Sequence, residues 1–565
     1  MNERPGPAAG SEPTRDKPHA WANFAAARWA AGLVVPDFLA LREGNRPLVI
    51  VAPHGGRRQR AIRRGDSVND LHTAEIAWEL AERLDAHALV NHGLDRNEID
   101  LNRITHLTRR APGVLALLSA AIDAASRDGS IPLVLFVHGW NMVVPCCDIG
   151  IGVRRRAGHL TGRYPTLSRE RYDGTIASIE RELVRRGVNA TIGRHYTASG
   201  RDNAAQLFSG RHSGDDDRMV AALGRLAVAG RVDAAQLELG IPLRWPGASR
   251  DAMLDGLVSA LGEDARPQVR DPEVDDDRRE TVAVPRAACG WCLHVDERAE
   301  KLPPLEPGFA FQAVIHPEGH LAMFGGVEAT GPRSMAARLS LVSTDGTMML
   351  LVGEGEWSGE PGHYCLEGFE WRTTDEARRA ELTLRAPMIR YRTHDAYLDL
   401  ELGLAGSELV EADVRLEFVA HSEAHGQLRG IVRAGGTVLD VDTVAFVDRG
   451  RRVGATVEAR LRVVASRADG SVEVARSATG PGATLRMEKK AGALGVIRAV
   501  PESPATGSLR EAEILARVPL WRPAADGSLA RWTFGIAKCR FEDGTEESVG
   551  LFDATEIFAP PRETS

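Results

Sequence analysis

The amino-acid sequence lacks the features that define several large protein classes. Its six cysteines in 565 residues are too few for a small secreted scaffold built on disulfides. It holds no apolar run of about eighteen residues, the length that a transmembrane helix needs, so no membrane span is predicted. The formal net charge of −8 gives no general basic surface for nucleic acid or for anionic lipid.

The N-terminus also lacks the apolar core of a secretory signal. Residues 1–20 are mostly Pro, Gly, Ala and charged residues, so we expect a disordered leader and a cytoplasmic protein. The whole chain is 43% hydrophobic and 26% charged, which is typical of globular proteins. A chain of this length predicts about two to four domains, and it leaves the oligomeric state open.

Two apolar stretches each end in a histidine that is followed by glycine. Residues 48–52 lead through a proline to His54, and residues 131–137 lead directly to His138. Both stretches are typical of buried strands in a parallel sheet, and ligands bind at the ends of such strands. One such histidine has a packing explanation. Two in the same context favour a shared metal ion, zinc, because neutral imidazole is its commonest protein ligand.

Five short motifs in residues 40–260 together resemble the N-formylglutamate amidohydrolase family, and more distantly the poly-γ-glutamate hydrolases and zinc carboxypeptidase-like enzymes. They are the Pro-His-Gly-Gly turn at His54, the Asp-x-x-Thr-x-Glu run from Asp70 to Glu75, the Asp-Leu-Asn-Arg run at 100–103, His138, and the Ala-Gln-Leu-Glu-Leu strand with Glu238. The resemblance implies a mixed α/β sheet with helices on both faces, over residues 21–262, and a zinc-dependent amidohydrolase.

The resemblance also implies the roles of individual residues. His54, Asp70 and His138 would hold Zn²⁺, and Glu238 would be the general base. Glu238 lies inside an apolar run, where a carboxylate is costly unless it is paired or functional. Asp70 is either a helix cap or the acidic ligand, and Glu75 is the alternative ligand, although its place beside an apolar stripe also suits a solvated helix face.

Asn102 and Arg103 occupy the place where the related enzymes hold the carboxylate of the substrate. An arginine fork matches a carboxylate in two-point contact, and the alternative is a structural salt bridge with Asp100. Basic loops at 57–64 and 154–156 are either solvated or attract an anionic substrate. The expected substrate is therefore a small molecule with a carboxylate, either an N-acyl amino acid or a γ-glutamyl amide.

The second half of the chain differs in character. Residues 263–281 form a charged linker that contains proline, and residues 282–565 alternate apolar and polar residues in segments such as 380–385 and 414–419. This pattern predicts an all-β antiparallel barrel or sandwich. A division into two subdomains near residue 405 is the alternative to a single domain. Residues 290–560 loosely resemble lipocalin-like proteins of the carotenoid hydratase and tocopherol cyclase type. The competing hypothesis is a non-catalytic protein whose β half binds a hydrophobic ligand.

Overall fold

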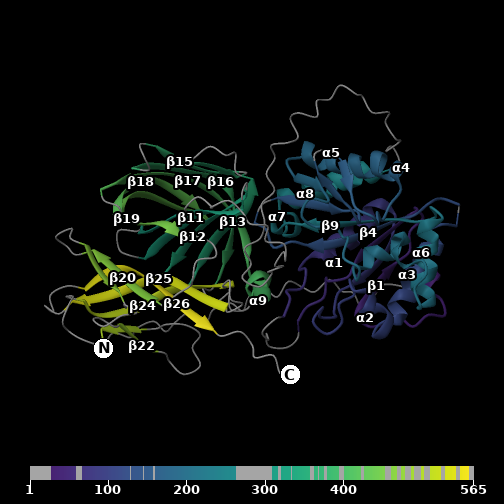
Figure 1. The fold of residues 1–565 in the computed structure, drawn as a ribbon, viewed down its shortest axis with the longest axis horizontal. Coiled ribbons are helices and arrows are strands. Elements are labelled where there is room, and N and C mark those ends of the chain that lie inside the picture. Colours follow the sequence, from purple (N-terminus) through teal and green to yellow (C-terminus); the bar gives the residue numbers. More distant parts are fainter. Residues whose placement is uncertain are drawn as a thin grey trace, which may run out of the picture.

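The computed structural model describes most of both halves of the chain (Figure 1). The predicted leader at 1–20 and the predicted linker at 263–281 lie outside the described residues. The described ranges are 27–58, 66–262 and 308–558, except for 128, 144, 157–158, 316–319, 332–333, 357–361, 367, 375–377, 393–399, 422–424, 452–459, 467–471, 477–484, 489–497, 502–508, 524–528 and 542–546.

A seven-stranded mixed sheet forms the centre of the N-terminal half, in the order β1-β3-β2-β4-β9-β5-β8. Strands β3, β2, β4 and β9 are parallel, whereas β1 and β5 run antiparallel to their neighbours β3 and β9. This confirms the predicted mixed α/β sheet. The strands are β1 (Leu39–Arg42), β2 (Leu48–Ala52), β3 (His87–Asn91), β4 (Leu133–Gly139), β5 (Cys146–Gly150), β8 (Asn189–Ile192) and β9 (Asp233–Leu239), and β6 (Arg154–Arg156) pairs separately with β7 (His159–Thr161).

Helices cover both faces of this sheet, as predicted. One apolar core includes side chains of α1 (Thr73–Leu84), α5 (Ala177–Arg185) and α8 (Ala248–Leu261). The core on the other face includes α2 (Ile104–Arg109), α3 (Pro112–Ala125) and α6 (Arg218–Val228). Shorter elements complete the half: α4 (Arg169–Arg171), α7 (Ile241–Arg244), a π-turn at Tyr172–Ile176, and 3₁₀ turns at Arg28–Ala30, Ala204–Phe208 and Gly210–His212.

The β half contains a closed antiparallel barrel of eight strands. A ten-stranded sheet runs in the order β13-β12-β11-β10-β19-β18-β17-β16-β15-β14, and pairing of β13 with β16 closes the ring. Its strands are β10 (Gly308–Val314), β11 (Leu321–Gly331), β12 (Ser334–Ser343), β13 (Met348–Glu356), β14 (His363–Leu366), β15 (Phe369–Thr374), β16 (Arg379–Tyr391), β17 (Glu408–Ala420), β18 (His425–Ala434) and β19 (Thr437–Arg451). The predicted all-β barrel is confirmed.

Alternating burial explains why these strands close into a barrel. Along β16, exposed and buried residues alternate for most of its length, as a sheet with one apolar face requires. Apolar side chains from all eight strands of the ring, among them Phe418, meet in one core with Phe369 and Trp371 of β15. The position near 405, where the sequence allowed a split, lies between β16 and β17, and these two strands pair directly.

A second antiparallel sheet of seven strands follows the barrel, in the order β21-β20-β26-β25-β24-β23-β22. It contacts β10, β11 and β12 of the barrel through β26, β25 and β24. Its strands are β20 (Arg460–Ser466), β21 (Val472–Arg476), β22 (Leu485–Glu488), β23 (Arg498–Pro501), β24 (Leu509–Pro523), β25 (Leu529–Phe541) and β26 (Glu547–Phe558).

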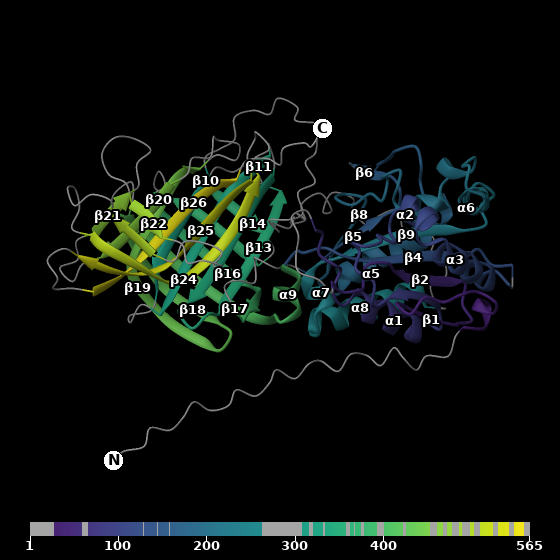
Figure 2. The same ribbon diagram turned by 90° about the horizontal axis from the view of Figure 1, so that it is seen from below.

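The two halves lie side by side and share a packed junction (Figures 1 and 2). One buried apolar cluster contains Val68, Leu71 and Trp245 from the α/β half together with Phe324 and Tyr391 from the barrel. The short helix α9 (Leu400–Ala405) lies at this junction in both views. None of the helices in the described ranges is both long enough and apolar enough to cross a membrane.

Candidate metal centre

Two neighbouring parallel strands bring His54 and His138 together. His54 comes directly after Pro53 at the end of β2, and His138 is the penultimate residue of β4. Because β2 and β4 are parallel neighbours, their carboxyl ends meet at one edge of the sheet. The two imidazole rings lie edge to face with centroids 4.8 Å apart. Both side chains are buried, with 1% and 3% of their surface exposed.

Asp70 completes the group from the loop before α1. Its Oδ2 lies 3.2 Å from His54 Nδ1 and 3.2 Å from His138 Nδ1. Its backbone is held on both sides, because Asp70 N donates to the carbonyl of His54 and Thr73 donates from both N and Oγ1 to the carbonyl of Asp70. Glu75, the alternative ligand, is not a member of this group.

The geometry of the three side chains suits a metal ion. Their ligand atoms all lie within 4.8 Å of one another, and two imidazole nitrogens with one carboxylate oxygen are a donor set that zinc accepts. Metal–ligand bonds of about 2.0–2.1 Å at tetrahedral angles place neighbouring ligand atoms roughly 3.3–3.4 Å apart. Both Nδ1–Oδ2 distances, at 3.2 Å, are close to that spacing. The His54–Asp70–His138 group could therefore hold a metal ion.

A further carboxylate orients one of the histidines. Asp100 Oδ1 lies 2.6 Å from His54 Nε2, the ring nitrogen that faces away from Asp70. Ligand histidines commonly donate their second N–H to a carboxylate, which fixes the tautomer and the ring orientation. On His138 the corresponding Nε2 is buried and has no hydrogen-bond partner within the part of the chain that the structure describes.

The charges in the group oppose the effect of burial. Burial and Arg96 lower the pKa of His54, but the carboxylates of Asp100 and Asp70 outweigh them, so this pKa is raised. At His138 burial prevails over Asp70, and the pKa falls to about 4. Burial raises the pKa of Asp70, but His54 and the hydrogen bond from His138 hold it well below its usual range. The group therefore contains an ionised Asp70 and a neutral His138 at neutral pH.

Glu238 lies beside this group on the next strand of the sheet. It stands opposite His138 in the parallel pairing of β9 with β4, so the two side chains project from the same face. It is 6% exposed, and Gln236 Nε2 donates to its Oε1 at 2.7 Å. Burial and the nearby charge of Asp70 raise the pKa of Glu238 well above its usual range. A carboxyl group with a raised pKa next to a group that could hold a metal ion is suited to carrying a proton.

Asn102 and Arg103 both contact Asp100, which in turn contacts His54. Asn102 N donates to Asp100 Oδ1 at 2.9 Å, and Arg103 Nε lies 3.3 Å from Asp100 Oδ2. The side chain of Arg103 is 60% exposed, and within the described residues Asn102 Oδ1 is buried without a hydrogen-bond partner. The salt bridge that the sequence allowed is thus present. Binding of a substrate carboxylate by these two residues stays a prediction.

Two arginines that sequence reasoning did not single out also belong to the site. Arg96 Nη1 donates to Asp70 Oδ1 at 3.3 Å, and Arg96 Nη2 lies 3.8 Å from Asp100 Oδ2. Arg244 is fully buried on α7 and donates from Nη1 to the carbonyl of Leu71. Arg244 lies in an apolar run, which is the signal that singled out Glu238. Arg96 lies in a polar stretch and gives no such signal.

The segment 154–156, predicted as a basic loop, forms strand β6 instead, and its Arg155 makes an ion pair. Arg155 is half-buried in β6 and donates from Nη1 to Glu180 Oε2 at 2.8 Å. Of the 57–64 loop the structure describes Arg57 and Arg58, which lie outside any strand or helix. Attraction of an anionic substrate by these two segments stays a prediction.

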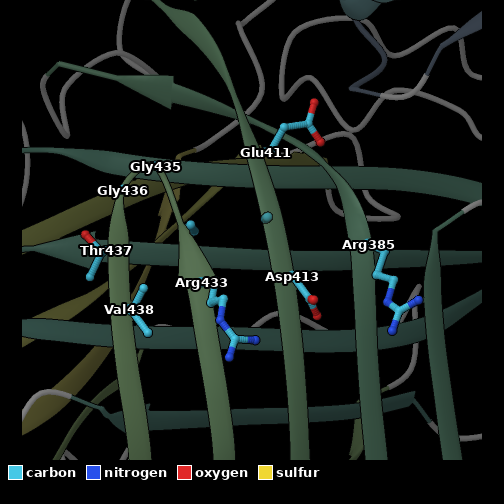
Figure 3. A pocket seen from close by; sticks show the side chains of 10 residues that line it. Arg385, Glu411, Asp413, Arg433, Gly435, Gly436, Thr437 and Val438 are labelled. Carbon is cyan, nitrogen blue, oxygen red and sulfur yellow. The ribbon is translucent and has the colours of Figure 1, made fainter.

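An open pocket of about 380 Å³ lies on the β half, on strands β16 to β19 (Figure 3). Arg385, Asp413 and Arg433 stand opposite one another on neighbouring strands, so charges of opposite sign alternate across the sheet. Such cross-strand pairs are ordinary sheet stabilisation. The pocket lies in the β half, whereas the His54–Asp70–His138 group lies in the α/β half.

Comparisons with known proteins find limited likeness. No family model and no curated protein matches the chain. Among solved structures, an N-formylglutamate amidohydrolase from Ralstonia eutropha JMP134 aligns over 39% of this chain and 96% of its own, with 18% identity and a TM-score of 0.26. A Nitrosomonas europaea protein assigned as AttH aligns over 45% of this chain and 93% of its own, with 12% identity and a TM-score of 0.28.

A third solved structure, CghA, aligns over 45% of this chain and 89% of its own, with 11% identity and a TM-score of 0.25. These identities and TM-scores are too low to carry an argument about activity. The function is therefore argued from the geometry of the site in this chain.

Proposed function

We propose that the α/β half is a zinc-dependent hydrolase that cleaves the amide bond of an N-acyl amino acid or a γ-glutamyl substrate. The observation that carries this proposal is the juxtaposition of the His54–Asp70–His138 group with Glu238 across the β4–β9 pair. A zinc ion bound there would polarise the amide carbonyl and lower the pKa of a water molecule. The residues around it supply the proton transfer and the orientation.

Glu238 carries the proton in this proposal. Its carboxylate accepts a proton from the attacking water, whose oxygen bonds to the carbonyl carbon. The same proton then passes from Glu238 to the amide nitrogen as the carbon–nitrogen bond breaks. Gln236 Nε2 fixes one carboxylate oxygen of Glu238, which leaves the other oxygen for the exchange. Asp100 holds the ring of His54 in one orientation throughout.

The substrate carboxylate would bind Arg103. The guanidinium of Arg103 is largely exposed, and its contact with Asp100 is made through Nε. A charge-assisted arginine–carboxylate bond contributes roughly 1.5–3 kcal/mol. The hypothesis of a hydrophobic-ligand carrier receives less support, because apolar side chains from all eight strands of the ring pack together in one buried cluster.

The experiment compares acid and amide forms of a panel of N-acyl amino acids as substrates. We expect the acid forms to be hydrolysed with kcat/KM about ten- to a hundredfold higher. In Arg103→Ala that preference should nearly disappear, with zinc content unchanged. Arg109→Ala, which removes another arginine from the nearby helix α2, is the control and should keep the preference. A full acid preference in Arg103→Ala would assign Arg103 to the salt bridge with Asp100 alone.

A further inference from the structure

The loop that carries Asp70 is built against the β half of the molecule. Val68 and Leu71 flank Asp70 closely in the sequence. Both are buried in the apolar cluster that includes Phe324, Tyr391 and Leu404 of the β half. Residues 68 and 71 therefore face the barrel, while Asp70 between them faces the two histidines. The carbonyl of Leu71 is fixed in addition by the buried Arg244.

One carboxylate of the β half reaches this loop directly. Glu401 on α9 is 4% exposed and accepts hydrogen bonds from N–H groups of the α/β half at both of its oxygens. Asn69 N donates to Oε2 at 3.1 Å, and Arg58 N donates to Oε1 at 2.7 Å. Arg58 lies four residues after His54, and Asn69 lies directly before Asp70. Glu401 thus fixes the chain next to two of the three candidate ligands.

The side chain of Asn69 connects Glu401 to Asp95 and Arg96. Its side-chain Nδ2 donates to Glu401 Oε2 at 3.1 Å and to Asp95 Oδ1 at 3.0 Å. Its Oδ1 accepts from Arg96 N at 3.0 Å. Arg96 in turn contacts the carboxylates of Asp70 and Asp100. Hydrogen bonds therefore lead from α9 of the β half through Asn69 and Arg96 to Asp70, and an ion pair continues from Arg96 to Asp100.

We propose that Glu401 is a positioning residue for the metal centre, so that the β half is a structural part of the site in the α/β half. The inference deepens the proposed function and rests on it for the presence of the metal. A ligand on a loop binds tightly only if surrounding contacts hold it in place before the metal arrives. Glu401 provides that restraint for Asp70, because three N–H groups converge on its two oxygens.

The test replaces Glu401 by glutamine in the full-length chain. Glutamine has the same shape, but its NH₂ group would face an N–H donor at one of the two oxygen positions, so at least one hydrogen bond is lost. Zinc affinity is measured by competition with a chelator, and the Co²⁺-substituted protein is examined by visible absorption, which reports ligand geometry. Glu411→Gln, an exposed glutamate of the same half, is the matched control.

We expect Glu401→Gln to bind zinc about ten- to a hundredfold more weakly, the range observed for residues that orient metal ligands. Its Co²⁺ spectrum should also change, whereas Glu411→Gln should match the wild type in both measurements. Wild-type affinity and an unchanged spectrum in Glu401→Gln would overturn the proposal. If Glu401→Gln does not fold, Glu401→Asp, which keeps both oxygens on a shorter side chain, is judged by the same criteria.

Failure of the proposed function is distinguishable from failure of this inference. A wild-type protein that binds no metal would refute the metal centre itself. A wild-type protein that binds zinc, with variants at Glu401 that bind it equally well, would refute only the role of Glu401.

Discussion

At the scale of single residues, the site depends on which atoms of His54 carry protons. Each ring nitrogen of His54 faces a carboxylate oxygen, Asp70 on one side and Asp100 on the other. Without metal this arrangement favours the doubly protonated ring, since the two carboxylates raise its pKa against the effect of burial. A metal at Nδ1 competes with one of these protons.

Metal binding should therefore release a proton from His54. Below the raised pKa of His54 the metal-free protein holds this proton, so the affinity for zinc should fall about tenfold for each unit by which the pH falls. Above that pKa the affinity for zinc should no longer depend on this proton. Glu238 also has a raised pKa and could release a proton when the metal binds. The count is therefore made in the Glu238→Gln variant, where the proton released comes from His54. Calorimetry in buffers of different ionisation enthalpy counts the protons. Adding Asp100→Asn lowers the pKa of His54 and should reduce the count at the same pH; an unchanged count would contradict this account.

Mutation can separate the proposed role of Glu238 from that of the candidate metal ligands. Glu238→Gln keeps the size of the side chain but cannot accept a proton, so the rate should fall at least about a hundredfold while zinc remains bound. Single-turnover hydrolysis and metal analysis measure the two effects. Glu75→Gln on α1 is the control and should leave the rate unchanged. If instead Glu75→Gln loses activity and Glu238→Gln keeps it, the base is Glu75.

At the scale of elements, α1 links the core to the loop that carries Asp70. Its apolar residues recur at helical spacing, and Ile76 and Leu80 are fully buried against the sheet. The helix begins at Thr73, three residues after Asp70, and His72 before it adopts a positive φ of 68°. The packing of α1 therefore fixes where the loop with Asp70 can end.

Truncation of Ile76 tests how firmly α1 is packed. Ile76→Ala should lower the free energy of unfolding by about 2–5 kcal/mol, because it leaves a cavity under a fully buried side chain. Val184→Ala on α5, where the valine is 53% exposed, should change it by less than about 0.5 kcal/mol. Urea denaturation measures both. Equal effects would mean that α1 does not pack as described.

Sequence pattern predicted the elements whose signal is local. The strands that end at His54 and His138 are continuous apolar runs, and Glu238 stood out because a carboxylate interrupts such a run. Strand β5, with Cys146 and Cys147, was not predicted, since a short stretch of small residues has no clear period. The contacts of Arg96 and Glu401 come from tertiary packing between distant segments, so no local pattern could indicate them.

At the scale of the whole molecule, the two halves share buried surface. The cluster with Val68, Leu71, Trp245, Phe324 and Tyr391 lies between them, and Glu401 adds hydrogen bonds across the junction. The boundaries predicted from sequence, 21–262 and 282–565 with a linker between, stay a prediction. An apolar junction of this kind predicts that the halves stay together without a covalent link.

Cleavage of the predicted linker tests this expectation. With a protease site inserted within residues 263–281 and cut, the two fragments should elute together in size-exclusion chromatography. Glu401→Gln combined with Tyr391→Ala, which removes both polar and apolar contacts, should make them separate more readily. Separate elution of the wild-type fragments would contradict a shared junction.

The most direct test of the central claim is the zinc content of the purified protein after equilibrium dialysis. We expect about one zinc ion per chain, lost together with activity on chelation. His54→Ala and His138→Ala should each abolish tight binding, because each removes one of three ligands. His87→Ala, a buried histidine of the same sheet outside the group, should keep the metal. Full zinc occupancy in the His54→Ala/His138→Ala double variant would contradict the assignment.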